Sequence, residues 1–216
     1  MRSMWTRFAA IFFGAFIVAF AVLNVRFVVA NVRYALAPGT IRTGDSLSQA
    51  VRLLPLAENI TDRPLPSRAR LVIDSIGVNA PIVFDLPADN KKIYDGLERG
   101  VVHYSTSVKP GQNGVALVLG HSSAYPWYRG SYGSVFALLN KLKPGEKFYI
   151  QYEGGPVFVF TVKRSLIFNP FASDARLAEL EQNPNPSIIL VSCWPVGTNY
   201  RRIAVQAEFV PAPGTR

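Results

Sequence analysis

Residues 187–210 read SIILVSCWPVGTNYRRIAVQAEFV, two apolar runs separated by a polar loop. The runs SIILVS and IAVQAEFV consist mainly of strand-forming residues and have the length of strands. The loop between them contains Pro, Gly and Asn, which favour chain reversal. Antiparallel pairing across this loop would return Arg202 to the end of the sheet where Cys193 leaves the first strand.

Short apolar runs of the same kind recur through most of the chain. They are LVIDSIGV, APIVF, VALVLG, KFYIQY and VFVFTVKR, each bounded by turn residues. Two helical patterns interrupt them, residues 134–142, closed by Pro144-Gly145, and residues 173–182, with Ser173 as N-cap. Many short strands with few helices predict a mainly β fold, either a barrel or a sandwich.

The composition excludes several classes of protein. The chain has 216 residues, enough for one domain with an appendage, and its 49% hydrophobic and 17% charged residues argue against disorder. One Cys and two His exclude a disulfide framework and a multi-cysteine metal site, so no metal and no cofactor are expected. The net charge is +9, but the basic residues form no run in the sequence, so a nucleic-acid partner is not expected.

The N-terminal end has the pattern of a membrane segment. Residues 8–25 carry no charge and apolar residues continue past Arg26, which predicts a transmembrane helix over 8–30. Arg2 and Arg7 precede this segment and favour a cytoplasmic N-terminus, although arginines also follow it. The alternative is a cleaved signal peptide, but the apolar stretch is long for one and no small-x-small cleavage site follows it.

The predicted organisation places these patterns in order along the chain. Residues between the apolar segment and the first strand mix Arg, Pro, Gly, Ser and Thr, with one short helical pattern at 47–56. No internal repeat is visible, so one active unit is expected. The expected parts are a cytoplasmic N-terminus (1–7), a transmembrane helix (8–30), a stalk with a short helix (31–69), a β domain (70–210) and a C-terminal tail (211–216).

Two side chains that could do chemistry follow apolar runs. Cys193 comes directly after SIILVS, and His121 comes directly after VALVLG. If the two strands are parallel neighbours, the imidazole reaches the thiol, which gives a nucleophile with a proton-transfer partner. Arg202 could then hold a substrate carbonyl or the oxyanion of a tetrahedral intermediate. The alternatives are a buried inert thiol, a hydrogen-bonded loop His and a strand-end charge.

These motifs resemble those of the bacterial sortases, which are membrane-anchored cysteine transpeptidases. The segment LVSCWPVGTNYRRIAV is similar to their signature of an apolar strand, a hydroxyl residue, Cys, a loop with Pro, Gly and Asn, and Arg nine positions after the Cys. The segment GVALVLGHSSAYPW is similar to the family's strand that ends in Gly-His. The segment GLERGVVHYSTSVKPGQNG is similar to the part of the family's sequence that precedes this strand. The resemblance covers roughly residues 70 to 210.

The resemblance implies both a fold and a mechanism. The fold is a closed eight-stranded β-barrel with one or two short helices, preceded by a transmembrane helix. The Cys193 thiolate attacks the carbonyl of a C-terminal sorting motif and forms a thioacyl enzyme, which an amine acceptor resolves. His121 acts as general acid and base, and Arg202, selected over Arg201 by counting from the Cys, stabilises the oxyanion.

The resemblance also implies partners, a location and further site residues. The partners are exported proteins with a sorting motif, an amine acceptor from the cell wall or a pilin, and the lipid bilayer, with the catalytic domain outside the cell. Ser192, which stands where many sortases have Thr, is expected to contact the substrate together with Trp194 and Asn199. His103 matches a frequent but non-catalytic His of the family.

Other protein classes fit these residues less well. Cysteine-dependent cross-linkers of peptidoglycan have a Ser-x-Gly-Cys pattern, whereas Val191-Ser192 precede Cys193 here. A papain-like protease needs its Cys at the start of a helix, and residues 194–197 have the composition of a loop. The remaining alternative is a non-enzymatic, membrane-tethered β domain that binds a cell-surface component and has an inert Cys193.

Overall fold

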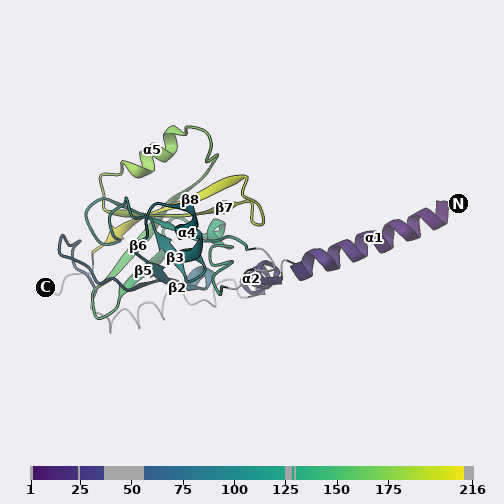
Figure 1. Cartoon of the computed structure of the whole chain (residues 1–216), viewed down its shortest axis with the longest axis horizontal. Coiled ribbons are helices and arrows are strands. Elements are labelled where there is room, and N and C mark those ends of the chain that lie inside the picture. Colours follow the sequence, from purple (N-terminus) through teal and green to yellow (C-terminus); the bar gives the residue numbers. More distant parts are fainter. Residues whose placement is uncertain (1, 24, 37–55, 125–127, 129, 212–216) are drawn as a thin grey trace.

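The computed structural model describes residues 2–23, 25–36, 56–124, 128 and 130–211, and their strands form one closed barrel (Figure 1). The strands follow one another around the barrel in the order β1-β2-β3-β4-β7-β8-β6-β5. Their bounds are β1 Ala69–Ile73, β2 Val78–Val83, β3 Val101–His103, β4 Val115–Leu119, β5 Lys147–Tyr152, β6 Val157–Phe168, β7 Ser187–Trp194 and β8 Arg201–Val210. The predicted closed eight-stranded barrel is confirmed.

Two of the neighbouring strand pairs are parallel, and the others are antiparallel. The parallel pairs are β2 with β3 and β4 with β7. A parallel pair needs a long crossover connection, and between β4 and β7 this connection contains the β5–β6 hairpin and helix α5 (Ala175–Glu181). The β4–β7 pair therefore joins segments that are far apart in the sequence.

The strands bury apolar side chains on both faces. In β8, Ile203 and Val205 lie in the core inside the barrel, whereas Ala204 belongs to a second cluster outside it. This alternation is the two-residue period of a strand. Inside the barrel the rings of Phe148 and Phe160 stack with their centroids 5.8 Å apart. The outer cluster lies on β4, β6, β7 and β8, and α5 contributes side chains to it.

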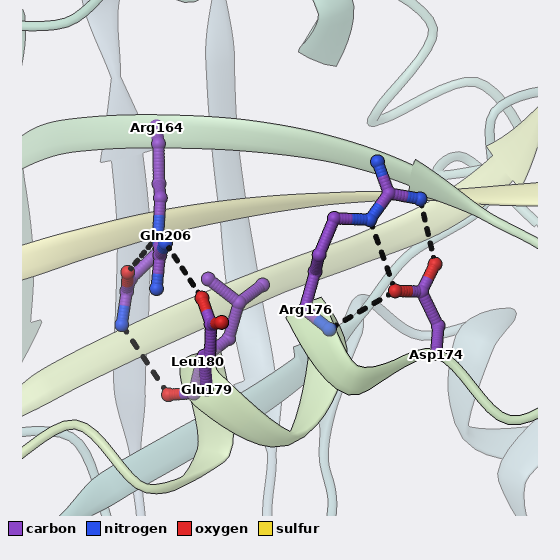
Figure 2. Close-up of polar contacts among 6 residues, drawn as sticks. All are labelled: Arg164, Asp174, Arg176, Glu179, Leu180 and Gln206. Carbon is purple, nitrogen blue, oxygen red and sulfur yellow. Dashed lines mark hydrogen bonds and ion pairs between the residues drawn. The ribbon is translucent and has the colours of Figure 1, made fainter.

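Helix α5 is attached to the barrel by both apolar and polar contacts. Leu180 is buried in the outer cluster. Figure 2 shows Arg164 of β6 and Gln206 of β8 beside the helix. Arg164 Nε donates to Gln206 Oε1 at 3.0 Å, and Gln206 Nε2 donates to the Leu180 carbonyl at 3.3 Å. The buried amide thus connects two strands to the end of the helix.

The N-cap of α5 differs from the sequence prediction. Asp174, not Ser173, caps the helix, and its carboxylate accepts a hydrogen bond from the backbone N–H of Arg176 at 3.0 Å. The same carboxylate also pairs with the Arg176 guanidinium at 2.7 Å (Figure 2). A carboxylate at this position can cap the helix and pair with the cation at once, which a hydroxyl cannot.

The prediction of a helix over residues 134–142 is also wrong. This segment consists of turns followed by the short 3-10 helix η2, Leu139–Lys141. Phe136, Ala137, Leu138 and Leu139 are consecutive and all buried, so the segment has no polar face. A second helix, α4 (Asn90–Leu97), was not expected and begins at the N-cap Asp89. One further 3-10 helix, η1, covers Asp74–Ile76.

In the described residues before the barrel the structure has two helices (Figure 1). They are α1, Arg2–Leu23, and α2, Val25–Leu36, so the segment 8–30 expected to cross the membrane takes in most of α1 and the first half of α2. Within the described residues, the helix stretch Met4–Val22 alone is long and apolar enough to cross a membrane, and none of it is buried. The short helix expected at 47–56 lies outside the described residues except for Leu56, which bridges to Val157.

Candidate active site

The parallel pairing of β4 with β7 brings the His and the Cys to the same level of the sheet. The last register pair is Leu119 with Val191, and the Gly120 backbone N–H donates to the Val191 carbonyl at 3.0 Å. Two residues further along each segment are His121 and Cys193. The condition for an imidazole to reach the thiol, that the two strands are parallel neighbours, is therefore met.

The three candidate residues share one face of the sheet. Leu117 and Val191 pack in the outer cluster, and His121 and Cys193 follow them at even spacing, so strand alternation places them on that same outer face. Arg202 lies directly opposite Cys193 in the antiparallel β7–β8 pair, and directly opposite residues point to the same side. The site is thus an extension of the apolar outer face beyond the part that α5 covers.

His121 is held between aromatic rings. Its ring lies 5.5 Å from the Tyr128 ring, edge to face, and 6.4 Å from the Tyr94 ring, roughly stacked. Its backbone carbonyl accepts from Phe136 N–H at 2.8 Å. Among the described residues, no carboxylate makes a hydrogen bond with this ring. Burial lowers the pKa of His121, and the charge of Glu98 raises it by less.

Ser192 connects the two strands from the inside. Its side chain is 2% exposed, and its hydroxyl donates to the Gly120 carbonyl at 2.7 Å. Gly120 immediately precedes His121, and Ser192 immediately precedes Cys193. The hydroxyl that was expected to contact the substrate is therefore directed into the protein, where it fixes the ends of β4 and β7 relative to each other.

Arg202 is partly exposed and bonded to its own loop. Its Nη1 donates to the Asn199 carbonyl at 2.9 Å and to the Arg201 carbonyl at 3.0 Å. Within the described part of the chain, Nε and Nη2 make no hydrogen bond, so three of the five guanidinium N–H groups are open for a ligand. Arg201 is exposed and its guanidinium lies over the Tyr200 ring, 5.6 Å from the centroid.

Of the other two predicted substrate-binding residues, Trp194 ends β7 and Asn199 lies in the loop between β7 and β8. Trp194 is half-buried and packs against the core inside the barrel. Asn199 is exposed, and its backbone carbonyl holds Arg202. Gly197 of this loop donates its backbone N–H to the Ser123 hydroxyl at 3.1 Å, which ties the loop to the segment after His121.

His103 is the last residue of β3 and is buried in the barrel. It is 3% exposed, and its Nε2–H donates to the Val108 carbonyl at 2.9 Å. The Phe84 ring lies 5.3 Å from its ring. Burial lowers the pKa of His103, partly offset by the Val108 hydrogen bond. The prediction that His103 is not catalytic stays a prediction, and these hydrogen-bond and ring contacts are compatible with it.

The tyrosines beside His121 were missed by the sequence analysis. Tyr94 projects from α4, and Tyr128 donates its hydroxyl hydrogen bond to the Leu97 carbonyl at the end of that helix, at 2.8 Å. A usable signal was present, because Asp89 caps the helix and Lys91 pairs with Asp95 four residues on. Among the described residues, no group of three His, Cys, Asp or Glu could hold a metal ion.

Comparisons with known proteins agree with this arrangement. The sortase domain model matches residues 71–210. No curated protein is similar enough in sequence to count as a match. Among solved structures, sortase C-1 from Actinomyces oris is 28% identical, with a TM-score of 0.54, over 67% of this chain and 73% of that one.

Two further solved structures share the fold at lower identity. The lid mutant of sortase A from Corynebacterium diphtheriae is 24% identical, with a TM-score of 0.55, over 70% of this chain and 74% of that one. The complex of Streptococcus agalactiae sortase C1 with MTSET is 23% identical, with a TM-score of 0.54, over 89% of this chain and 92% of that one.

The Ser192 hydrogen bond can be tested by substitution. Ser192→Ala should lower the free energy of unfolding by about 1–2 kcal/mol, because the buried Gly120 carbonyl loses its donor. It should also slow alkylation of Cys193 by iodoacetamide, because His121 is no longer held level with the thiol. Ser192→Thr should restore both values. Ser187→Ala is the matched control: Ser187 is also buried on β7, and its hydroxyl has no partner among the described residues. Equal effects of the two Ala variants would contradict the assignment.

The burial of the two histidines predicts that the free energy of unfolding falls at acidic pH. Both folded pKa values lie below the usual value of about 6.5 because of burial. Between those lowered values and about 6.5 the unfolded chain binds more protons, so the free energy of unfolding rises with pH in this window and is at its full value above it. NMR titration of the two imidazoles, assigned with His103→Gln, should give both midpoints below that of a free imidazole side chain. A midpoint above it for His121 would show that a charged partner, not burial, dominates.

Proposed function

This chain belongs to the sortase family of cysteine transpeptidases, and on that premise we propose that it cleaves a C-terminal sorting motif of exported proteins and transfers the product to an amine. The observation that supports this most is the cross-strand pairing of Cys193 with Arg202, at the level that His121 reaches from β4. A thiol, an imidazole and a guanidinium on one face are the groups that acyl transfer through a thioester requires.

The proposed reaction has two steps. Cys193 Sγ gives its proton to His121 and attacks the carbonyl carbon of the scissile peptide bond. The C–N bond breaks, His121 returns the proton to the leaving amine, and a thioester with Cys193 remains. The acceptor amine then attacks the thioester, gives its proton to His121, and the thiol is restored as the new amide forms. The lowered pKa of His121 leaves a neutral imidazole available for the first proton.

Arg202 is proposed to stabilise the charge that forms on the carbonyl oxygen. Its Nη1 is bonded to two backbone carbonyls of its own loop, which limits where the guanidinium can point. The open Nε and Nη2 hydrogens can then donate to the oxyanion of either tetrahedral intermediate. Donors fixed before the reaction stabilise such charge with little reorganisation.

We propose that α1 anchors the protein in the cell membrane, with the N-terminus in the cytoplasm and the barrel outside. The support is the apolar helix stretch Met4–Val22, none of which is buried and which has the length to cross a bilayer. The acceptor amine in this location is supplied by a cell-wall precursor or by a pilin. The alternative of a non-enzymatic surface-binding domain predicts that no acyl enzyme forms.

The experiment uses the full chain in detergent, a positional-scanning library of short peptides and hydroxylamine as the amine acceptor. Wild type should form a thioester with Cys193, seen as an added mass, and release peptide hydroxamates. Cys193→Ala should form neither, because the chain has no other Cys. His121→Ala should be severely impaired, whereas His103→Ala, which is buried away from the thiol, should keep most of its turnover. An adduct on Cys193→Ala, or greater damage from His103→Ala, contradicts the proposal.

The role of Arg202 predicts a difference between two neighbouring arginines. Arg202→Lys should slow single-turnover acylation by on the order of 10², because an ammonium cannot hold the loop carbonyls and present two further N–H groups at once. Arg201→Lys should have little effect, since Arg201 is exposed, stacks on Tyr200 and lies on the opposite face by strand alternation. Equal, small effects would reduce Arg202 to an ordinary strand-end charge.

A further inference from the structure

Helix α2 presents a stripe of exposed apolar side chains. Val25, Val29, Val32 and Leu36 are exposed by 53%, 39%, 48% and 81%. Their spacing of four, three and four residues places them in one line along the helix. We call these four residues the α2 stripe. Isolated exposed apolar residues need no explanation, but a continuous line of them along a helix marks an interaction surface.

The opposite side of α2 packs against the barrel. Ala30 and Tyr34, one turn apart, lie about half a helix turn from the stripe, and both pack on the core of the barrel. Lys141 Nζ lies 5.9 Å from the centroid of the Tyr34 ring, a cation–π contact. Because this side of the helix is held, the α2 stripe points away from the barrel.

The position of α2 in the chain restricts what the stripe can meet. Helix α1 ends at Leu23 and α2 begins at Val25, so the two helices are almost contiguous in the sequence. The 22 residues of α1 extend about 33 Å, close to the roughly 30 Å of a bilayer's hydrocarbon core. If α1 crosses the membrane, α2 begins at the membrane surface. Figure 1 shows α2 at this junction, between α1 and the barrel.

The charges of α2 suit a lipid surface. Its sequence VRFVVANVRYAL contains two arginines and no acidic residue. Arg33 is exposed beside the stripe. An apolar line beside an exposed basic side chain, on a helix without acidic residues, fits a helix that lies in the membrane interface, with apolar residues in the acyl boundary and cations at anionic headgroups.

We propose that α2 lies in the outer membrane–water interface with the α2 stripe toward the acyl chains, and that it holds the barrel against the bilayer through Ala30 and Tyr34. The partner is a lipid surface with anionic headgroups. The inference rests on the proposed membrane anchoring by α1. It adds that the barrel is fixed to the membrane surface at a defined side and height, whereas a plain tether would leave it free to move.

The test uses the full chain in vesicles of phosphatidylcholine and phosphatidylglycerol in equal amounts. Cys193→Ala removes the only Cys, so single spin labels can be placed by Val32→Cys or Leu36→Cys. Phe16→Cys in α1 is the bilayer control, and Tyr94→Cys, on the exposed side of α4, is the aqueous control. Collision with dissolved oxygen, which concentrates in lipid, is compared with collision with a water-soluble nickel complex.

The expected result is a shift of the oxygen-to-nickel ratio at Val32 and Leu36 from the Tyr94 value toward the Phe16 value. Ratios equal to that at Tyr94, with Phe16 in the bilayer, overturn the interfacial position of α2 and leave the anchor intact. Low collision with both reagents would show that a second copy or another part of the chain covers the stripe, which also overturns it. An aqueous ratio at Phe16 would overturn the anchor itself, and the inference with it.

Discussion

The pairing of β4 with β7 is the constraint on which the site depends. These strands contribute the imidazole and the thiol, and two hydrogen bonds, Gly120 N–H to the Val191 carbonyl and the Ser192 hydroxyl to the Gly120 carbonyl, fix their ends. Because strand side chains alternate, a slip of one residue would turn one of the two groups into the barrel interior. The Ser192 hydrogen bond on the inner face therefore helps to set the relative position of His121 and Cys193 on the outer face.

The sequence predicted the local half of this site and only part of the rest. Cys193 and Arg202 lie on two strands joined by a short loop, so hairpin geometry alone brings them together. His121 reaches Cys193 through a parallel pair that no local pattern specifies, and its assignment depended on a condition and on the family resemblance. The helix α4 and its Tyr94 were missed, because eight mostly polar residues give a weak pattern.

Where the predictions failed, long-range packing overrode local signals. Residues 134–142 have helix-forming composition, yet four consecutive buried side chains beginning with Phe136 cannot belong to a helix with one polar face. The N-cap of α5 is Asp174 rather than the predicted Ser173, and the Asp174 carboxylate also pairs with Arg176. The predicted substrate contact of Ser192 stays a prediction; alternation along the strand turns its hydroxyl toward the Gly120 carbonyl.

The order of the strands also determines when the enzyme becomes active. The imidazole follows the fourth strand, the thiol ends the seventh, and the guanidinium begins β8, the last strand of the barrel. A chain that crosses the membrane with its N-terminus retained delivers β8 last. Until that strand emerges, the thiol lacks both its cross-strand neighbour and the closed wall behind it. With the proposed topology, a partly exported molecule therefore lacks a complete site.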